Sequence, residues 1–538
     1  MTRSHRASAV AAGLAVVLAI GACSGDDDDT GDDDGSEPSA EIGTLPEEAA
    51  EIMAKAPYAT ARWIYYVADA ESGEVLLANR ADEMVFTGST AKGFMVGAVY
   101  ETLGPDTRLT TPVYATTPVD DGVVDGDLVL VASGDLALGG RNALEGRIDH
   151  TFDADSVDHV YAHVAPNATR VGDPLAGLDD LARQIADRGV TRVDGDVVID
   201  TSIWQDFQGQ EGPTTAIFVN DNLVDVQVTA AAEGEPATIE VTPETSFFTV
   251  ESDVETVAED GETVLSVTAS DDDPSTLVVS GTIAEGSSQL ATYRVQQTAE
   301  WARTLFIEAL ERAGVEVAAE TGQPNDQSTL AASDSYPSDQ RLATLESPTL
   351  GEMGTMIMEM SYNMGGNSFM CLLAVERGSD NCIDGLKTVY ELAEEAGIDT
   401  NVLFLVDGQG ADPASTTPRQ IARWMQWSLE QPWGEEFVAG QPVLGETGSL
   451  AANGHGSPAV GKVAAKVGTS ASPGLVTGRL YSVLQSLAGY LTLDDGRVLV
   501  FGLSMSGGTY PQVYEGLVEA GEDVALVAAA FQQELSNQ

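Results

Sequence analysis

The sequence predicts an α+β protein with a mostly β middle, and three observations carry this prediction. Residues 63–104 show two strand patterns followed by an apolar helical pattern. Residues 106–341 consist mainly of short alternating runs, such as VVDGDLVLV and LVDVQVTA, each bounded by Gly, Asp or Pro. From residue 342 to the end, helical and strand patterns alternate again. We therefore expect three parts, at residues 47–105, 106–341 and 342–538.

The first part reads as a hairpin that leads into a helix. Two apolar strand patterns between Trp63 and Phe86 surround a turn at Ser72-Gly73. The helix that follows keeps apolar residues at helical spacing and stops at Gly104-Pro105. Its apolar face is expected to anchor it in a core.

The other two parts contain helices as well as strands. Two amphipathic helices are expected in the middle part, one around residues 178–185 and one over TAEWARTLFIEALERAG. In the last part, Pro348 is expected to open a Met-rich helix that reaches Ser361. A strand hairpin with its turn at Asp494-Asp495-Gly496 and a final helix over residues 512–535 would complete the fold.

The charge of the chain excludes one class of function. Lys and Arg number 25 against 85 Asp and Glu, which gives a formal net charge of −60. A nucleic-acid binder needs a basic surface, so this class is set aside. The acidic run at residues 26–35 does not match the spacing of a calcium loop, and the five histidines form no zinc-like set. We expect neither a metal nor a cofactor.

The N-terminus reads as a targeting segment. Arg3 and Arg6 precede an apolar run that ends at residue 22 and is too short to span a membrane. The run ends in IGAC, which resembles the lipobox of bacterial lipoproteins, so residues 1–22 would be removed and Cys23 lipidated. The alternative is an ordinary signal peptide with an incidental cysteine. Residues 23–46 are expected to form an acidic, disordered tether, which places an exported protein on the outer face of the cytoplasmic membrane, held there by its N-terminal lipid.

Two further cysteines remain after export. Cys371 and Cys382 are close in sequence, and in an oxidising compartment this favours a disulfide. The alternative is a pair of buried thiols.

The catalytic hypothesis begins at Ser89 and Lys92. Residues three apart on a helix share a face, so a deprotonated Lys92 could take the proton from the Ser89 hydroxyl without a histidine. The Ser-x-x-Lys pattern is short, and its alternative reading is a polar first helical turn.

Two later motifs strengthen this hypothesis. Ser361-Tyr362-Asn363 fits a Ser-x-Asn element, and Lys466-Val467-Gly468-Thr469 fits a Lys-Thr-Gly element with one departure. They follow the serine in the order used by penicillin-recognising acyl transferases. His159 and His163 are four residues apart but lack the signature of a zinc protease, and no serine lies in a nucleophile elbow. Ser-Lys chemistry is therefore the coherent hypothesis.

Nearly all of the chain after the signal resembles one family, the type-4 low-molecular-mass penicillin-binding proteins, which are D-alanyl-D-alanine carboxypeptidases and endopeptidases. The resemblance is carried by GSTAK, VNDNLVDVQVT, SYN, DGQGADPASTTPRQIARW, and GSPAVGKVAAKVGTS followed by SLAGYL. It implies a transpeptidase-like, or β-lactamase-like, domain in which helices flank an antiparallel sheet on both sides. It also implies that a large insertion, here residues 106–341, splits this domain.

The resemblance and the chemistry together assign the catalytic roles. Ser89 would attack the carbonyl of a terminal D-Ala-D-Ala peptide, and Lys92 would accept its proton. Ser361 would relay a proton to the leaving amine, while Asn363 would orient Lys92 and the substrate amide. The backbone N–H groups of Ser89 and Thr469 would form the oxyanion hole.

Substrate binding is assigned to the Lys466 motif. Lys466 would attract the terminal carboxylate, Gly468 would leave room for the substrate, and Thr469 would contact the carboxylate. The expected partners are peptidoglycan stem peptides and β-lactam antibiotics.

Three positions depart from the family pattern. Val467 replaces a threonine, Gln409 replaces the serine of a DGSG-like element, and Asn367 stands where an acidic residue is common. None removes the nucleophile or its base. Two alternatives to a carboxypeptidase stay open, namely a β-lactamase-type hydrolase and a lipid-anchored wall-binding protein without turnover.

Overall fold

The computed structural model describes residues 41–328, 330 and 335–538. The predicted signal at residues 1–22, the lipidation site Cys23 and the tether up to residue 40 lie outside the described residues. Within the part of the chain that is described, no helix is both long enough and apolar enough to cross a membrane.

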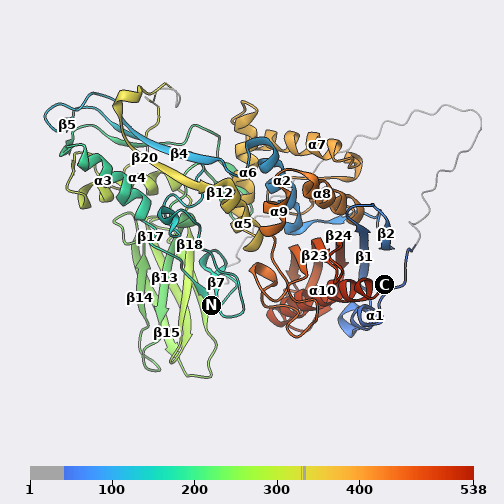
Figure 1. Cartoon of the computed structure of the whole chain (residues 1–538). Helices are drawn as coiled ribbons and strands as arrows, with labels where there is room; N and C mark the ends of the chain where they lie inside the picture. The colour runs from blue at the N-terminus through green and yellow to red at the C-terminus, as the bar shows by residue number, and fades with distance from the viewer. Residues whose placement is uncertain (1–40, 329, 331–334) are drawn as a thin grey trace, which may run out of the picture. The chain divides into compact units, whose positions relative to one another are not determined.

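An antiparallel sheet in the order β2-β1-β24-β23-β22 joins the two ends of the described chain, and β25 pairs with β23. Figure 1 shows β23, β24, β1 and β2 side by side in this sheet. Its central contact is the pairing of the N-terminal strand β1 with the C-terminal strand β24. This arrangement confirms the predicted α+β, transpeptidase-like fold. The strands are β1 (Arg62–Asp69), β2 (Val75–Asn79), β22 (Val463–Pro473), β23 (Leu480–Thr492), β24 (Val498–Ser506) and β25 (Gly508–Tyr510).

Helices cover both faces of this sheet because its strands are apolar on both sides. On β1, Tyr66 and Ala68 join one core, while Tyr65 and Val67 join the other. The first core includes the helices α2 (Lys92–Leu103), α5 (Leu350–Glu359), α6 (Asn363–Glu376), α7 (Gly385–Glu395), α8 (Pro418–Glu430) and α9 (Gly434–Ala439). The second includes α1 (Glu47–Met53) and α10 (Val513–Ser536), and Figure 1 shows α8 and α10 on opposite sides of β23 and β24.

The chain between α2 and α5 forms a separate set of sheets. One sheet has the order β10-β6-β4-β20 and packs against α3 (Ala176–Asp187) and α4 (Thr298–Arg312), the two helices expected there. Two others have the orders β14-β13-β18 and β15-β17-β16. Their strands are β4 (Arg108–Ala115), β6 (Leu128–Val131), β10 (Val197–Asp200), β13 (Leu223–Thr229), β14 (Thr238–Thr242), β15 (Thr249–Val257), β16 (Val264–Ala269), β17 (Thr276–Ala284), β18 (Ser288–Arg294) and β20 (Arg341–Thr349).

Short strands complete the structure. They are β3 (Val85–Phe86), β5 (Val123–Val124), β7 (Val157–Asp158), β8 (Ala168–Thr169), β9 (Arg192–Val193), β11 (Phe207–Gly209), β12 (Gly212–Thr214), β19 (Glu316–Val317) and β21 (Ser415–Thr416). The pair β11–β12 is a tight hairpin that contacts α6, and it therefore carries the insertion into the catalytic region.

Two boundaries differ from the sequence expectation. Ile42, placed in the tether, exchanges backbone hydrogen bonds with Ala78 on β2, so the chain joins the sheet before residue 47. Pro348 lies in β20 rather than opening a helix, and β20 is an edge strand, where proline is tolerated. The helix α5 begins two residues later, because Thr349 and Glu352 form a reciprocal capping box.

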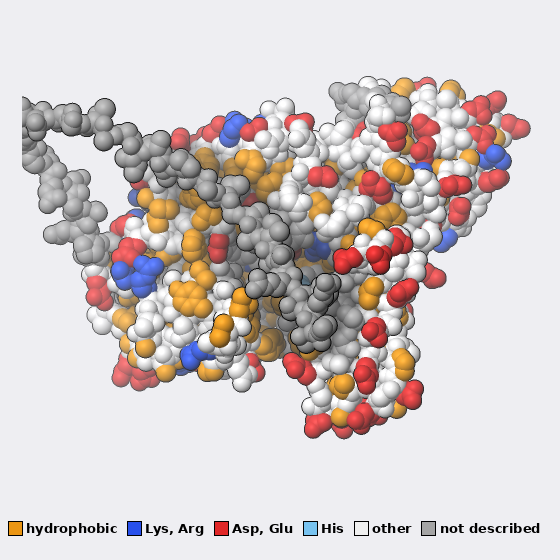
Figure 2. All heavy atoms as spheres, turned by 180° about the vertical axis from the view of Figure 1, so that it is seen from behind, with side chains coloured by type: hydrophobic (Ala, Val, Ile, Leu, Met, Phe, Trp, Pro, Cys, Tyr) orange, Lys and Arg blue, Asp and Glu red, His pale blue; other side chains and the backbone are white. Residues whose placement is uncertain are grey.

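The surface is acidic on the face seen in Figure 2. Asp and Glu side chains are spread over much of this face, while Lys and Arg are sparse. This distribution agrees with a solvated acidic surface and a net charge of −60.

Candidate active site

Ser89 and Lys92 meet at the start of α2. Ser89 lies in a short 3₁₀ turn (Gly88–Ala91), and Lys92 is the first residue of the α-helix that follows. The Lys92 Nζ lies 2.6 Å from Ser89 Oγ, 2.7 Å from Asn363 Oδ1 and 3.0 Å from the Gln409 carbonyl oxygen. Lys92 is fully buried, and these three oxygens are its hydrogen-bond partners.

This geometry suits a neutral lysine acting as a base. A neutral amine has two N–H donors and one lone pair, and two of its three neighbours are carbonyl oxygens that only accept. If Asn363 Oδ1 and the Gln409 carbonyl take the two donors, the lone pair faces Ser89 Oγ. The Ser89 hydroxyl is then in position to give its proton to Lys92.

Burial makes the neutral form accessible. It lowers the pKa of Lys92 to about 7, although the negative charges of Glu211 and Asp407 oppose the change. Lys466 is also fully buried, and burial together with the positive charge of Lys92 holds its pKa well below the usual range. Among the described residues, no carboxylate lies within ion-pair distance of either lysine. The site therefore offers two buried amines without a counter-ion.

The strand β22 places Lys466 beside the nucleophile. Lys466 Nζ donates to the carbonyl of Val467 at 2.9 Å, and the side chain of Val467 packs against the second core, on the opposite face of the sheet. This is the alternation expected along a strand. Thr469 is exposed, and its hydroxyl donates to Gln485 Oε1 at 2.9 Å.

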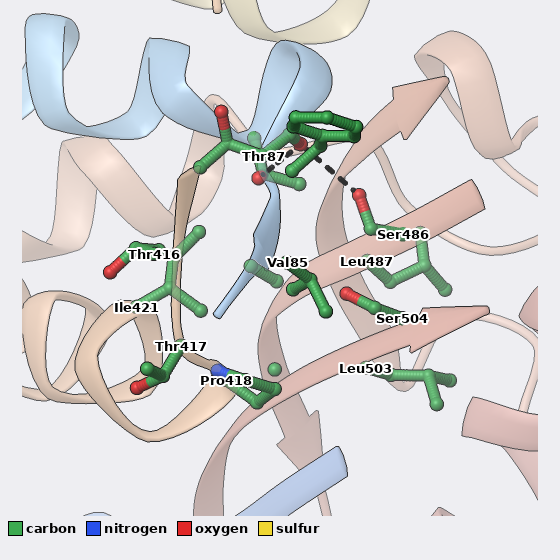
Figure 3. Close-up of a pocket in the computed structure, with 14 residues that line it drawn as sticks. Val85, Thr87, Thr416, Thr417, Pro418, Ile421, Ser486, Leu487, Leu503 and Ser504 are labelled. Carbon is green, nitrogen blue, oxygen red and sulfur yellow. Dashed lines mark hydrogen bonds between the residues drawn. The ribbon is translucent and has the colours of Figure 1, made fainter. Parts of the chain in front are cut away.

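From the sequence, Gly468 was expected to leave room for the substrate. In the structure, that space is filled by the protein itself. A Cβ at this position would lie 2.4 Å from the Thr87 carbonyl oxygen and 2.5 Å from Ser486 Oγ. Figure 3 shows Thr87 and Ser486 joined by a hydrogen bond at the edge of a small pocket behind the nucleophile turn. The missing side chain thus lets β22 pack closely against this turn.

The same close approach brings two backbone amides together. Gly88 has φ +49°, and a Cβ there would lie 3.1 Å from the Thr469 nitrogen. Ser89 follows Gly88 directly, so its amide and that of Thr469 lie on neighbouring segments of backbone. This is the arrangement that an oxyanion hole requires.

The Ser-x-Asn element turns sharply into α6. Ser361 has φ +62°, which is strained for a residue with a side chain, and its carbonyl accepts a hydrogen bond from Tyr161 Oη at 2.8 Å. Tyr161 belongs to the insertion, so the insertion holds the strained residue in place. Two residues later, Asn363 begins α6 and reaches Lys92.

Comparison with known proteins decides the family. Residues 45–522 match the D-Ala-D-Ala carboxypeptidase 3 (S13) family. The chain belongs to this family. Over 470 residues it is 27% identical to a D-alanyl-D-alanine carboxypeptidase of Actinomadura sp. (strain R39), covering 83% of this chain and 78% of the relative. The protein is accordingly a D-Ala-D-Ala carboxypeptidase of the S13 family, as the sequence predicted.

Solved structures support the fold. Penicillin binding protein 4 of Haemophilus influenzae matches with a TM-score of 0.66 at 17% identity, covering 91% of this chain and 99% of that one. The same protein in complex with a β-lactam matches with a TM-score of 0.66 at 18% identity, over 91% of this chain and 98% of that one.

Two of the residues that depart from the family pattern, Asn367 and Gln409, lie together next to the catalytic lysine. Asn367 Oδ1 accepts from the Gly408 amide at 3.0 Å, and the next carbonyl, that of Gln409, accepts from Lys92. Within the described residues, Asn367 Nδ2 and Gln409 Oε1 are buried without a hydrogen-bond partner. Asp407 Oδ1 accepts from the amides of residues 409, 410 and 411 and so fixes the loop that presents the Gln409 carbonyl.

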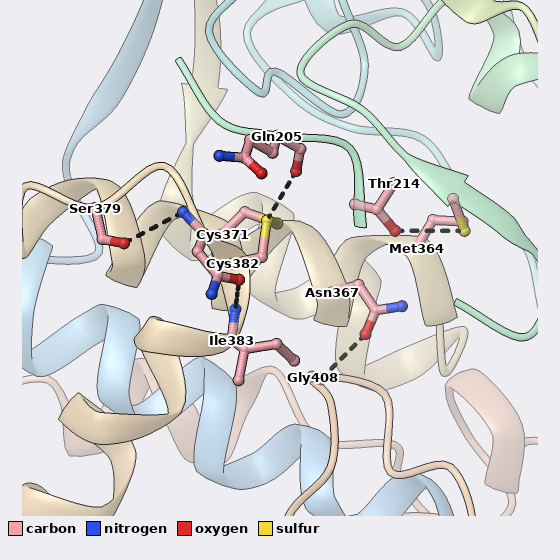
Figure 4. The surroundings of a disulfide bond; sticks show 10 residues. Gln205, Thr214, Met364, Asn367, Cys371, Ser379, Cys382, Ile383 and Gly408 are labelled. Atoms are coloured by element: carbon pink, nitrogen blue, oxygen red, sulfur yellow. Dashed lines mark hydrogen bonds between the residues drawn. A yellow bond between two sulfur atoms is a disulfide. The ribbon is translucent and has the colours of Figure 1, made fainter. Parts of the chain in front are cut away.

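A disulfide joins Cys371 on α6 to Cys382, eleven residues further on (Figure 4). It ties the helix that begins at Asn363 to the segment leading into α7. Figure 4 also shows Asn367, one turn earlier on α6, bonded to Gly408. Hence α6 is fixed at both its catalytic end and its middle.

Several residues of the enzyme's site were not predicted from the sequence. Glu211 and Tyr161 come from the insertion, and no motif marks either of them. Asp407 and the Gln409 carbonyl lie in DGQG, a string that pointed to the family but not to a contact with Lys92. In the described part of the chain, no three His, Cys, Asp or Glu side chains are arranged to hold a metal ion.

Proposed function

We propose that the enzyme removes the terminal D-Ala from peptidoglycan stem peptides through an acyl-enzyme on Ser89. The Ser89 Oγ attacks the carbonyl carbon of the D-Ala-D-Ala bond while its proton passes to Lys92. The amides of Ser89 and Thr469 stabilise the oxyanion. The C–N bond then breaks, Ser361 passes the proton to the departing amine, and water releases the shortened peptide and restores Ser89.

The single observation that carries this proposal is the set of three oxygens around Lys92 Nζ. Two of them can only accept, and the third is the Ser89 hydroxyl at 2.6 Å. A lysine with a pKa of about 7 is partly neutral at the pH of the cell envelope and can act as the base.

Lys466 is proposed to bind the terminal carboxylate of the substrate. Its buried amine lacks a counter-ion among the described residues, so an incoming carboxylate would favour the protonated form. A β-lactam presents a carboxylate and a reactive amide in a similar relation, and the matched Haemophilus influenzae protein was solved with one bound. We propose that β-lactams acylate Ser89 of this chain as well.

Lipid anchoring at Cys23 is a further proposal, and it rests on the sequence. The IGAC string ends an apolar run behind two arginines, and an acidic segment follows it. The acyl chains would hold the protein on the outer face of the cytoplasmic membrane, since an acidic tether gives no affinity for anionic lipid. A Cys23→Ala variant should leave the membrane fraction, and its retention there would contradict the proposal.

The catalytic proposal is tested with a fluorescent penicillin and a D-Ala-D-Ala peptide. Stable label on Ser89, mapped by mass spectrometry, together with release of D-Ala from the peptide supports a carboxypeptidase. Rapid loss of the label with hydrolysis of penicillin would instead show a β-lactamase. Absence of both label and D-Ala release would show a wall-binding protein without turnover.

A further inference from the structure

The hairpin β11–β12 carries one acidic residue of the insertion into the catalytic site. Its turn holds Glu211, whose side chain is about one quarter exposed. The hairpin sits tightly on the first turns of α6, because a Cβ on Gly209 would lie only 2.9 Å from Asn367 Nδ2. Thr214 lies beside Met364, with Oγ1 3.9 Å from the sulfur (Figure 4). The position of Glu211 is therefore fixed relative to the Ser-x-Asn element.

Glu211 contacts the asparagine that touches the base. Asn363 Nδ2 donates a short hydrogen bond to Glu211 Oε1, while Asn363 Oδ1 faces Lys92 Nζ at 2.7 Å. An ionised carboxylate only accepts hydrogen bonds, so it holds the nitrogen end of the amide on its own side. The oxygen end must then face Lys92.

The orientation of this amide decides what Lys92 can do. If the amide were reversed, its N–H group would point at Lys92 and compete for the lone pair that accepts the Ser89 proton. With the oxygen toward Lys92, the amide takes an N–H of the amine and leaves the lone pair to Ser89. An asparagine alone does not select between these two orientations.

Glu211 also contributes to the charge around the base. Lys92 is faced by Asn363 on α6, by the Asp407 loop, by Lys466 on β22 and by Glu211 on the hairpin. Asp407 is committed to three backbone amides of its own loop. Arg294 Nη2 lies 3.8 Å from Glu211 Oε2, a second contact that helps to hold the carboxylate in place.

We propose that Glu211 is a positioning residue, supplied by the insertion, that fixes the Asn363 amide so that the lone pair of Lys92 stays on Ser89. This inference rests on the proposed role of Lys92 as the base. It gives the insertion a part in acylation itself, besides any part in substrate selection.

Two substitutions separate the contact from the charge. Glu211→Gln removes the charge and offers both a donor and an acceptor, so the Asn363 amide is no longer held in one orientation. Glu211→Asp keeps the charge but withdraws the carboxylate from Asn363 by one methylene. Glu240→Gln, on an exposed position of β14, is the matched control for loss of one negative charge on the insertion.

The measurement is the rate of penicillin acylation of the full chain between pH 5.5 and 9. For Glu211→Gln we expect the plateau rate to fall about tenfold, the effect of one lost charged hydrogen bond. The acid limb of the plot of acylation rate against pH should move to lower pH by about half a pH unit or more. The reason is that removing the negative charge of Glu211 lowers the pKa of Lys92. Glu211→Asp should lose plateau rate with a smaller move of the limb, and Glu240→Gln should match the parent.

A double-mutant comparison tests the route through Asn363. In an Asn363→Ala background, Glu211→Gln should cause almost no further loss of plateau rate, since there is no amide left to orient. An equal loss in both backgrounds, or a Glu211→Gln variant with the plateau and acid limb of the parent, would overturn the proposal. If the parent itself is not acylated, the proposed function fails instead, and the two failures are distinct.

Discussion

Two buried groups of charges in this enzyme respond to burial in opposite ways. In the catalytic site, Lys92 and Lys466 are fully buried without a counter-ion among the described residues, and the pKa of each is lowered. In the insertion, Arg141 and His159 are buried among three carboxylates, and the pKa of His159 is raised to about 10. Burial is thus common to both groups. Whether a buried side chain keeps its positive charge depends on whether carboxylates lie beside it.

The contacts in the insertion explain its stable charges. Arg141 donates to both oxygens of Asp158, at 2.7 and 2.8 Å, and to Asp221 at 2.8 and 3.0 Å. His159 contacts Asp221 with Nε2 and Asp225 with Nδ1, both at 2.9 Å. Burial alone would neutralise His159, but Asp225 and Asp221 outweigh it.

The fold thus keeps the catalytic lysines apart from the charges that support the structure. A paired network holds its protons and serves as a scaffold, whereas an unpaired lysine can release its proton and serve as a base. The network and the catalytic site nevertheless lie near each other. Burial and the negative charge of Asp221 together raise the pKa of Tyr362, the middle residue of the Ser-x-Asn element.

The largest effect is expected from removing the base. Lys92→Ala should lower the rate of penicillin acylation by about 10²–10⁴-fold, the range for loss of general base catalysis. Ser89→Ala should abolish the label entirely. The rate is measured with fluorescent penicillin at pH 7.5, with circular dichroism as the control for folding. A Lys92→Ala variant that labels as fast as the parent would show that another group is the base.

Breaking the paired network should lower the stability of the folded protein rather than the rate of acylation. Asp221→Asn leaves Arg141 and His159 with one carboxylate fewer in a buried site, and such a change typically costs about 3–5 kcal/mol in the free energy of unfolding. Urea unfolding measures the change. Asp194→Asn, at a largely exposed ion pair with Arg192, should cost less than about 1 kcal/mol. Equal costs at the two positions would contradict the distinction.

The charge on His159 predicts how stability depends on pH. Its pKa is about 10 in the folded protein and 6.5 in an ordinary setting, so the folded state binds the extra proton between these values. The contribution is fully present below pH 6.5 and is lost as the pH rises toward 10. A difference of one between the folded and unfolded pKa corresponds to about 1.4 kcal/mol, so several kcal/mol should be lost across this range.

A matched pair of histidine variants isolates this effect. His159→Gln should lose stability at pH 6.5 and show a flatter dependence up to pH 10. His163→Gln, at an exposed position of the same segment, should keep the slope of the parent. If the parent and His159→Gln have parallel pH profiles, His159 is not the titrating group.

The disulfide should contribute a smaller stabilisation. Cys371 and Cys382 close a loop of eleven residues, for which the entropic stabilisation is about 2–3 kcal/mol. The Cys371→Ala, Cys382→Ala double variant should therefore unfold at a lower urea concentration. Mass spectrometry of the native protein should find no free thiol at these positions. Two free thiols in native material would reject the bond.

The sequence predicted the fold and the residues that carry recognisable motifs. Ser89, Lys92, Asn363 and Lys466 sit at motif spacings, and periodicity located α3, α4 and the strand hairpin β23–β24. The helix α6 was missed because its residues are buried nearly all round, which removes the amphipathic signal.

The rest of the site depends on contacts that the sequence does not encode locally. Glu211 meets Asn363 across 152 residues, and Tyr161 meets Ser361 across 200. Gly468 was misread because only the fold shows that the Thr87 carbonyl occupies the space beside it. A spacing pattern identifies residue types for chemistry, but it cannot show which distant segment supports them.

The smallest effect is expected at Val467, the departure nearest the chemistry. Its side chain packs against the second core with α10, away from Lys466 and from Ser89. A threonine here would turn its hydroxyl toward apolar side chains, where it cannot reach a substrate carboxylate. Valine has nearly the volume of threonine and places no hydroxyl against these apolar side chains, so it should support the strand at least as well as threonine.

Val467→Thr should accordingly change kcat/KM on a D-Ala-D-Ala peptide by less than about threefold. Thr469→Val is the matched variant, because Thr469 lies two positions further along the same strand, on the same face as Val467, but is exposed, whereas Val467 is partly buried against the second core. If the Thr469 hydroxyl contacts the substrate carboxylate, loss of that charge-assisted bond, about 1.5–3 kcal/mol, should lower kcat/KM about 10- to 100-fold. A gain above about tenfold in Val467→Thr would show instead that position 467 has lost a substrate contact.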